Sequence, residues 1–187
     1  MLDKKVVDTL KSIVGDENVL TDAGDLLTYS YDGTPDQPQV LPEVVVMPES
    51  EEEIVQIVKL AKEEGLHIYT RGSGTNLSGG TIPLRKGIVL VTTRMNKIVE
   101  VDAENLTATV QPGVVINTLN DAVSPYGLMY PPDPGTVKTA TMGGSVSESS
   151  GGLRGLKYGV TKDYVLSLIH ISEPTRRVDG SRMPSSA

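Results

Sequence analysis

One glycine-rich stretch decides how this sequence is read: Arg71-Gly72-Ser73-Gly74-Thr75-Asn76-Leu77-Ser78-Gly79-Gly80. It follows a strand-like segment directly and carries four glycines within residues 72–80, so it cannot form regular structure. Glycine allows positive φ angles and lets a ligand approach the backbone without a Cβ in the way. Successive amides in such a turn point into one concavity that suits a phosphate or pyrophosphate. The stretch therefore predicts an anion-binding loop, with a plain tight loop as the alternative.

Two familiar phosphate-binding loops do not fit this stretch. A Rossmann dinucleotide loop needs a third glycine where Leu77 stands and a helix immediately afterwards, which Gly79, Gly80 and Pro83 prevent. A Walker loop needs Gly-Lys-Ser/Thr, which the sequence lacks. We therefore expect the loop to bind phosphate in a different fold.

The residues before the loop predict a β-α-β unit. The apolar run Val44 to Met47, stopped by Pro48, is typical of a buried strand. Ser50 and Glu53 have the spacing of a capping box, and a helix follows to about residue 65. A second strand over residues 67–71 would make a parallel pair with a right-handed crossover. Further upstream, residues 1–20 form a helical region with an amphipathic helix over 2–14, and residues 21–42 read as a long loop or arm.

The residues after the loop predict a second group of elements. Strands are expected over 88–92, 98–101 and 107–111, and the short connection between the last two indicates a hairpin. Apolar spacing predicts a helix over 114–123. Residues 131–135 form rigid extended chain because each proline fixes its own φ and restrains its predecessor. A second Gly/Ser-rich stretch runs from 143 to 159.

Composition narrows the class of protein. The 17 Lys and Arg against 24 Asp and Glu give a net charge of −7, which argues against a nucleic-acid partner. The absence of cysteine excludes disulfides, thiolate metal sites and a cysteine nucleophile. No apolar run is long enough to cross a membrane, and the N-terminal residues do not look like an export signal. We expect a cytoplasmic protein, with peripheral membrane association through partner subunits as an alternative.

The loop and its surroundings resemble the FAD-binding domain of the p-cresol methylhydroxylase (PCMH)/vanillyl-alcohol oxidase superfamily. The likeness rests on Arg-Gly-x-Gly-Thr-x-Leu-x-Gly-Gly after a strand, with the preceding strand and helix. A second block is similar to the branch of the glycolate oxidase FAD-linked subunit and D-lactate dehydrogenase. That block comprises Tyr130-Pro131-Pro132-Asp133-Pro134, Thr141-Met142-Gly143-Gly144-Ser145-Val146-Ser147-Glu148-Ser149-Ser150-Gly151-Gly152 and Lys157-Tyr158-Gly159. The resemblance implies an α/β (α+β) fold, with a β-α-β lead-in and a mixed second sheet with helices, truncated here.

The resemblance also implies a cofactor site for FAD. Amides of residues 72–76 would hold the pyrophosphate, and residues 132–136 and 143–152 would line the flavin side. Relatives with covalent flavin carry His where Thr75 stands, so FAD here should be non-covalent. Relatives often carry Asn in place of Ser145, which leaves its contact open. The implied cofactor-binding residues are Arg71, Gly72, Ser73, Gly74, Thr75, Asn76, Gly79, Gly80, Pro132, Asp133, Pro134, Gly135, Thr136, Thr141, Gly143, Gly144, Ser145, Ser149, Gly151 and Gly152.

Several of these residues have a structural alternative. Arg71 could form a structural ion pair instead of contacting pyrophosphate. Asp133 could order its own turn. Lys157 could pack within its loop instead of contacting flavin. His67 is expected to be a surface or structural histidine. No metal-ligand cluster is visible in the sequence, so no metal site is expected.

The resemblance covers residues 1–165, of which 43–165 would be the incomplete FAD-binding domain. Residues 166–187 resemble the translation of a sequencing-library adapter, and we expect them to be a non-native, disordered tail. The cap domain that carries the catalytic residues in such enzymes is then absent, and the catalytic residues stay unknown.

The implied parent enzyme is a flavin-dependent dehydrogenase or oxidase of a small 2-hydroxy acid, glycolate or D-lactate. It would transfer a hydride from the substrate carbon to flavin and pass electrons to an iron–sulfur subunit or an electron-transfer flavoprotein. The alternatives are another flavoenzyme of the superfamily, or an inactive fragment that keeps a residual phosphate-binding loop.

Overall fold

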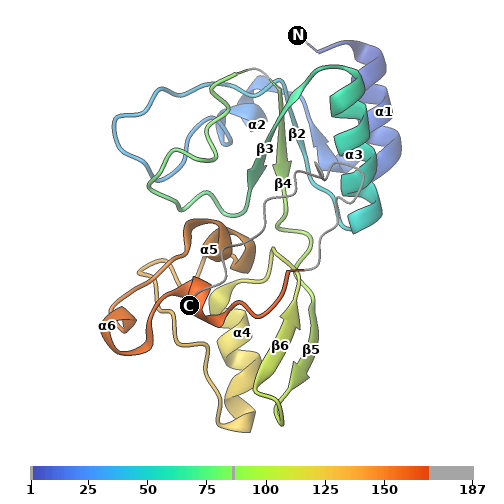
Figure 1. The fold of residues 1–187 in the computed structure, drawn as a ribbon. Helices are drawn as coiled ribbons and strands as arrows, with labels where there is room; N and C mark the ends of the chain where they lie inside the picture. The colour runs from blue at the N-terminus through green and yellow to red at the C-terminus, as the bar shows by residue number, and fades with distance from the viewer. Residues whose placement is uncertain (1, 86, 169–187) are drawn as a thin grey trace, which may run out of the picture.

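The chain forms two lobes, each built on its own β-sheet (Figure 1). The computed structural model describes residues 2–85 and 87–168. The first lobe ends near residue 91, and the second comprises the described residues after it. The expected tail lies outside the described residues from 169 onward.

The first lobe contains a four-stranded sheet in the order β1-β2-β4-β3. Its strands are β1 (Val19–Leu20), β2 (Val44–Val46), β3 (His67–Arg71) and β4 (Gly87–Val91). Strands β2 and β3 both run parallel to β4, whereas β1 is antiparallel to β2. The expected direct pairing of β2 with β3 is therefore wrong, because β4 lies between them. All five residues of β4 are buried, as a central strand requires.

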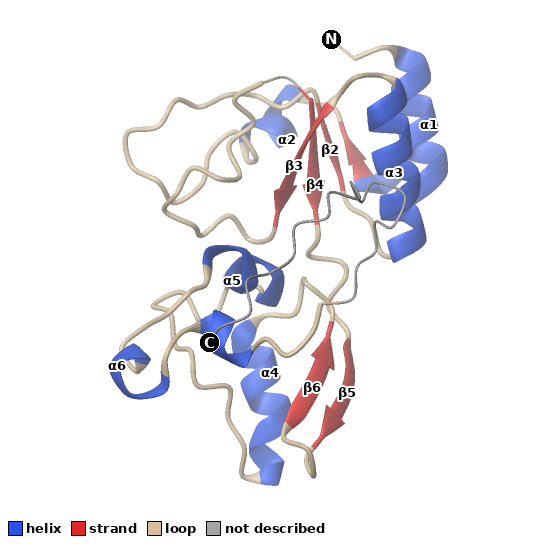
Figure 2. Ribbon diagram, in the orientation of Figure 1, coloured by secondary structure: helices blue, strands red, loops and turns tan. Residues whose placement is uncertain are grey.

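Helices cover both faces of this sheet (Figure 2). On one face, α1 (Lys4–Val14) and α3 (Glu51–Glu63) pack their apolar sides against Val44, Val46, Ile88 and Leu90. On the other face, Leu26 of α2 (Ala23–Leu27) packs with Val45, Val89 and Val91. The alternation of residues 44–46 between the two faces follows from the two-residue period of a strand.

Two short elements correct the sequence-based expectation for the N-terminal region. Residues 1–20 contain the strand β1 after α1, and residues 21–42 contain α2 rather than loop alone. Both elements are shorter than the window over which periodicity can be recognised, so sequence pattern gave no signal. The rest of residues 28–43 is irregular chain that lies beside the glycine-rich loop (Figure 1).

The second lobe is built on the antiparallel hairpin of β5 (Ile98–Asp102) and β6 (Thr107–Val110). Helix α4 (Ile116–Val123) buries Ile116, Leu119 and Val123 in the core of this lobe. The mixed pairing expected of the second sheet is found instead in the first sheet. The remaining helices, α5 (Met142–Glu148) and α6 (Gly155–Tyr158), lie within the second Gly/Ser-rich stretch, where no helix was expected.

Helix α5 forms in spite of its glycines because its first turn is held from outside. Thr141 caps the helix by accepting a hydrogen bond from Gly144. The amides of Met142 and Gly143 donate to the carbonyls of Val114 and Pro112. Residues 2–85 and 87–168 also contain 3₁₀ turns at Asp16–Asn18, Ser124–Tyr126 and Thr161–Tyr164. Among the described residues, no helix is long and apolar enough to cross a membrane.

Candidate functional site

Strand β3 delivers the glycine-rich loop to the edge of the first lobe that faces α5 (Figure 1). The loop reverses direction at Gly74 and Gly79, whose φ angles of 72° and 70° lie in the left-handed region. L-residues with a side chain rarely adopt this region, whereas glycine does so readily. The two glycines therefore allow the loop to fold back beside its own strand.

The loop leaves a row of amides without partners. Within the described residues, no backbone N–H of Gly72 to Asn76 donates a hydrogen bond to the protein. Each residue of Gly72 to Asn76 is half-buried or exposed as a whole. Unpaired backbone N–H groups are suited to an anion. A ligand that displaces water from them must accept their hydrogen bonds in its place, and the oxygens of an anion can do so.

The two glycine-rich segments meet at Gly72. A Cβ on Gly72 would overlap the Oγ1 atom of Thr141, the residue that caps α5. A second contact joins the same two segments, because the Ser78 hydroxyl donates to Glu148 over 2.7 Å. The structure thus brings together the start of the loop and α5, as the implied cofactor site requires.

Helix α5 differs from the loop in how its amides are used. Those of Met142, Gly143 and Gly144 are all committed to protein acceptors, so the helix N-terminus offers no free donors. One side chain on α5 is unpaired, since the hydroxyl of Ser145 is buried and has no hydrogen-bond partner among the described residues. A buried hydroxyl without a partner costs free energy, which a bound polar group can recover.

Arg71 lies against the turn at Gly74, where a Cβ would overlap its guanidinium. Only 7% of the residue is exposed, and its guanidinium donates to the carbonyl of Tyr31 over 2.6 Å. It also lies 5.5 Å from the centre of the Tyr29 ring. Burial lowers the pKa of Arg71, although the charge of Asp32 opposes that shift. These contacts are made with a carbonyl oxygen and an aromatic ring rather than with a carboxylate, so they differ from the ion pair that the sequence offered as the alternative for Arg71.

The segments 130–136 and 149–164 are joined in the second lobe. A Cβ on Gly152 would overlap the carbonyl of Asp133, and the Asp133 carboxylate lies 3.6 Å from the Arg154 guanidinium. Thr161 is fully buried and accepts a hydrogen bond from the Tyr130 hydroxyl over 3.1 Å. Burial raises the pKa of Tyr130, so its hydroxyl is a donor at neutral pH. These contacts hold the proline segment against the chain that follows α5.

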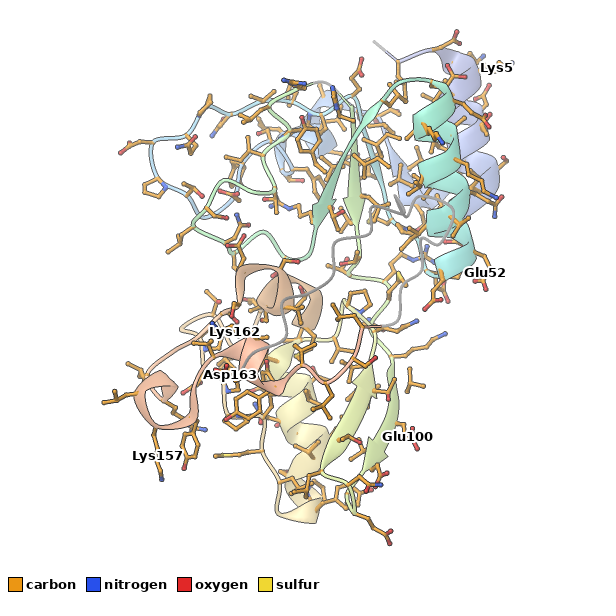
Figure 3. All side chains as sticks on the ribbon, in the orientation of Figure 1. Lys5, Glu52, Glu100, Lys157, Lys162 and Asp163 are labelled. Atoms are coloured by element: carbon orange, nitrogen blue, oxygen red, sulfur yellow. The ribbon has the colours of Figure 1, made fainter. Side chains whose placement is uncertain are left out.

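Some residues predicted from the sequence take no part in the contacts described above. Gly135 and Thr136 are exposed on a turn, and no Cβ contact restricts Gly135. Lys157 lies on α6 at the outer edge of the second lobe (Figure 3), with its ammonium 4.7 Å from the Tyr158 ring. Among the described residues, no group of acidic or histidine side chains could hold a metal ion.

Sequence reasoning missed four residues that surround the loop: Tyr31, Asp32, Thr34 and Thr81. Asp32 accepts hydrogen bonds from Asn76 and Thr81, and Thr34 accepts one from the amide of Gly79. Most of these contacts cross more than forty residues of sequence, so no local pattern announces them. The only signal was the density of Tyr, Asp, Gly and Thr at 29–34 in a segment without periodicity.

The chain matches the family model of the FAD binding domain over residues 42–174. It is 50% identical over 168 residues to the glycolate oxidase subunit GlcD of Bacillus subtilis, covering 90% of this chain and 36% of that protein. It is 46% identical over 145 residues to D-lactate dehydrogenase of Archaeoglobus fulgidus, covering 75% of this chain and 32% of the relative. The chain therefore spans about a third of the length of these curated relatives.

Solved structures show the same architecture. An alkyldihydroxyacetonephosphate synthase matches with a TM-score of 0.78 and 26% identity, over 87% of this chain and 35% of its own. A p-cresol methylhydroxylase with substrate bound matches with a TM-score of 0.69 and 25% identity, over 78% of this chain and 29% of its own. Together with the glycine-rich loop after β3, these likenesses show that the chain belongs to the FAD binding domain family, within the PCMH/vanillyl-alcohol oxidase superfamily.

Proposed function

We propose that this chain is the FAD-binding part of a flavin-dependent dehydrogenase or oxidase of a small 2-hydroxy acid. The observation that carries the proposal is the row of unpartnered amides at Gly72 to Asn76, in a chain of the FAD binding domain family. The substrate class is supported by two relatives, at 50% and 46% identity, that are named for glycolate and D-lactate.

The residues present fit FAD at the pyrophosphate. A pyrophosphate carries negative charge and many acceptor oxygens, which match consecutive backbone donors in a turn. Because Gly72 and Gly74 have no Cβ, the turn can pack against Thr141 and the Arg71 guanidinium while its own amides stay unpaired. The unpaired hydroxyl of buried Ser145 offers one further polar contact on the α5 side.

The flavin side of the site would be formed by residues 132–136 and 143–152. The chain's contribution is to hold and orient the cofactor, because the redox chemistry in flavoenzymes belongs to the flavin itself. Thr75 has no nucleophilic imidazole and the chain has no cysteine, so attachment would be non-covalent. We assign the FAD-binding part to residues 43–165.

The parent protein would work with other subunits. Two relatives, from Bacillus subtilis and Escherichia coli, are named as subunits of a glycolate oxidase. An iron–sulfur subunit or an electron-transfer flavoprotein is the chemical class that could accept electrons from reduced flavin. We place the parent in the cytoplasm, with contact to a membrane made only through such partners.

The test is flavin content and reduction in the protein encoded by the complete gene. We expect a flavin absorbance band in the purified protein, and bleaching of that band when glycolate or D-lactate is added without oxygen. A protein that lacks flavin and does not take up added FAD would contradict the cofactor assignment. Flavin that no 2-hydroxy acid reduces would favour another flavoenzyme of the superfamily or an inactive fragment.

A further inference from the structure

The glycine-rich loop is held by residues of the preceding arm as well as by its own side-chain contacts, in which Asn76 pairs with Ser78 and Thr81. Its amides at 72–76 make no hydrogen bonds within the described protein, so the loop has no internal ladder to fix its shape. Its side chains instead converge on Asp32, which lies outside the segment that matches the family model. We infer that Asp32 is a positioning residue that holds the loop open for the cofactor pyrophosphate.

The carboxylate of Asp32 is fully engaged. One oxygen accepts from the backbone N–H of Thr34 over 2.9 Å. The other accepts from Asn76 Nδ2 over 2.7 Å and lies 3.1 Å from the hydroxyl of Thr81. Asn76 ends the row of free amides and Thr81 follows the last glycine, so one side chain fixes both ends of residues 76–81 and, through Asn76, the end of the free-amide row.

Backbone contacts strengthen the same connection. The amide of Gly79 donates to the hydroxyl of Thr34 over 2.7 Å. A Cβ on Gly33 would lie 2.9 Å from the carbonyl of Asn76, so the arm and the loop touch at the level of the main chain. The carbonyls of Thr75 and Asn76 face the arm at Gly33, which leaves the opposite side of the turn for an incoming ligand.

Charge explains how an acidic residue can serve an anion site. Only 9% of Asp32 is exposed, and its oxygens already have three donors, so its charge is directed into the protein. The buried guanidinium of Arg71 lies close enough for its pKa to respond to Asp32, and it is fixed by the carbonyl of Tyr31. Asp32 and Arg71 can therefore both support the loop without contacting the phosphate.

The inference rests on the proposed function, because it assumes that the loop receives the FAD pyrophosphate. Its physical content is preorganisation: a loop already held in the binding conformation loses less freedom when the ligand binds. Without Asp32 the free amides would populate many orientations, and the ligand would have to order them. Affinity should fall even where the fold is intact.

The experiment measures the dissociation constants of FAD and ADP for the protein from the complete gene and for its Asp32→Asn variant. ADP carries the pyrophosphate without the flavin. We expect Asp32→Asn to weaken both ligands by about ten- to a hundredfold, since hydrogen bonds to a charged acceptor are lost. Asp36→Asn is the matched control, because Asp36 is an exposed residue of the same arm at a φ of 57°, which Asn tolerates. It should leave both constants within twofold.

Two further measurements separate positioning from a general loss of structure. In hydrogen exchange of the unliganded variant, the loop amide of Gly79, which donates to Thr34, should lose protection while the amides of buried β4 keep theirs. Thr81→Val removes one partner of Asp32 with little change in volume, and its effect should be less than additive with that of Asp32→Asn.

The outcomes are distinguishable. Binding of FAD and ADP by Asp32→Asn within twofold of the unmodified protein would overturn the inference and leave the proposed function standing. Equal loss of protection in the loop and in β4 would also overturn it, because Asp32 would then be a structural residue only. Absence of FAD and ADP binding in the unmodified protein would overturn the proposed function itself.

Discussion

Gly74 is under two separate constraints. Its φ of 72° is unfavourable for a residue with a side chain, and a Cβ there would overlap the guanidinium of Arg71. That guanidinium is buried against the carbonyl of Tyr31, so it has little room to move aside. A side chain at 74 would therefore disturb both the turn and its support.

Substitution of Gly74 by valine should abolish FAD binding and lower the free energy of unfolding by about 1–3 kcal/mol, the usual cost of a residue held in a disfavoured region. Gly65→Val is the matched control, because Gly65 has a φ of 66° with open space around it, far from the loop. The control should show the backbone cost without the loss of FAD. Urea denaturation and flavin content of the purified variants are the measurements, and stoichiometric flavin in Gly74→Val would contradict the assignment of the loop.

Thr75 decides whether flavin can be attached covalently at this position. Because it provides no nucleophilic nitrogen, we expect acid precipitation of the holoprotein to release all flavin into the supernatant. Fluorescence of the supernatant and of the washed pellet measures the two fractions. Thr75→His places an imidazole at this position, and a fraction of pellet-bound flavin in that variant alone would agree with the assignment. Pellet-bound flavin in the unmodified protein would refute it.

At the scale of elements, some features could be predicted because their signals are local. The capping of α3 by Ser50 is one, since the Ser50 hydroxyl accepts from Glu53 over 3.2 Å as the sequence spacing indicated. The hairpin of β5 and β6 is another, because its short connection allows little else. The glycine-rich loop itself was predictable because glycines at those positions exclude regular structure.

Features that depend on packing at long range could not be predicted. Strand β4 lies between β2 and β3, where both of its edges are paired and both of its faces are covered. Both β2 and β4 are apolar and fully buried, so hydrophobicity alone does not tell which of the two pairs with β3. The contacts of Asp32 could not be predicted from the composition of residues 29–34, because its partners Asn76 and Thr81 are 44 and 49 residues away.

Gly152 shows how one element boundary depends on a missing side chain. A Cβ on Gly152 would overlap the carbonyl of Asp133, so the proline segment and the chain after α5 can approach only at a glycine. We expect Gly152→Ala to push these segments apart, to lower the free energy of unfolding by about 1–3 kcal/mol, and to weaken FAD binding. Gly155→Ala is the control, because nothing lies within 4 Å of a Cβ at that position. Equal thermal stability of the two variants would contradict the close approach.

At the scale of the whole molecule, acidity and the Asp32 contacts act in opposite directions. The chain carries a net charge of −7 at pH 7 and has a sequence pI of about 4.8, so acidification toward that pH relieves its self-repulsion. Burial raises the pKa of Asp32, but hydrogen bonds from Thr34, Asn76 and Thr81 outweigh burial, so that its pKa lies below the ordinary value of 3.8. A lowered pKa in the folded state means that the charged form stabilises the fold.

The stability due to Asp32 should therefore be complete above pH 3.8 and should be lost as the pH falls through the lowered pKa of the folded state. We expect the unmodified protein to exceed Asp32→Asn in free energy of unfolding by about 1–3 kcal/mol at pH 6, the range for hydrogen bonds to a charged acceptor. The two curves should converge at pH values below the lowered pKa of folded Asp32, because protonated Asp32 then resembles the amide. Urea denaturation across this range gives both curves.

Asp36→Asn removes the same charge from an exposed residue, so its curve should run close to that of the unmodified protein and show that net charge alone is not the cause. A difference between the unmodified protein and Asp32→Asn that stays constant as the pH falls from 6 until the unmodified protein unfolds in acid would mean that the carboxylate's charge makes no contribution, and that the loop is held by shape alone.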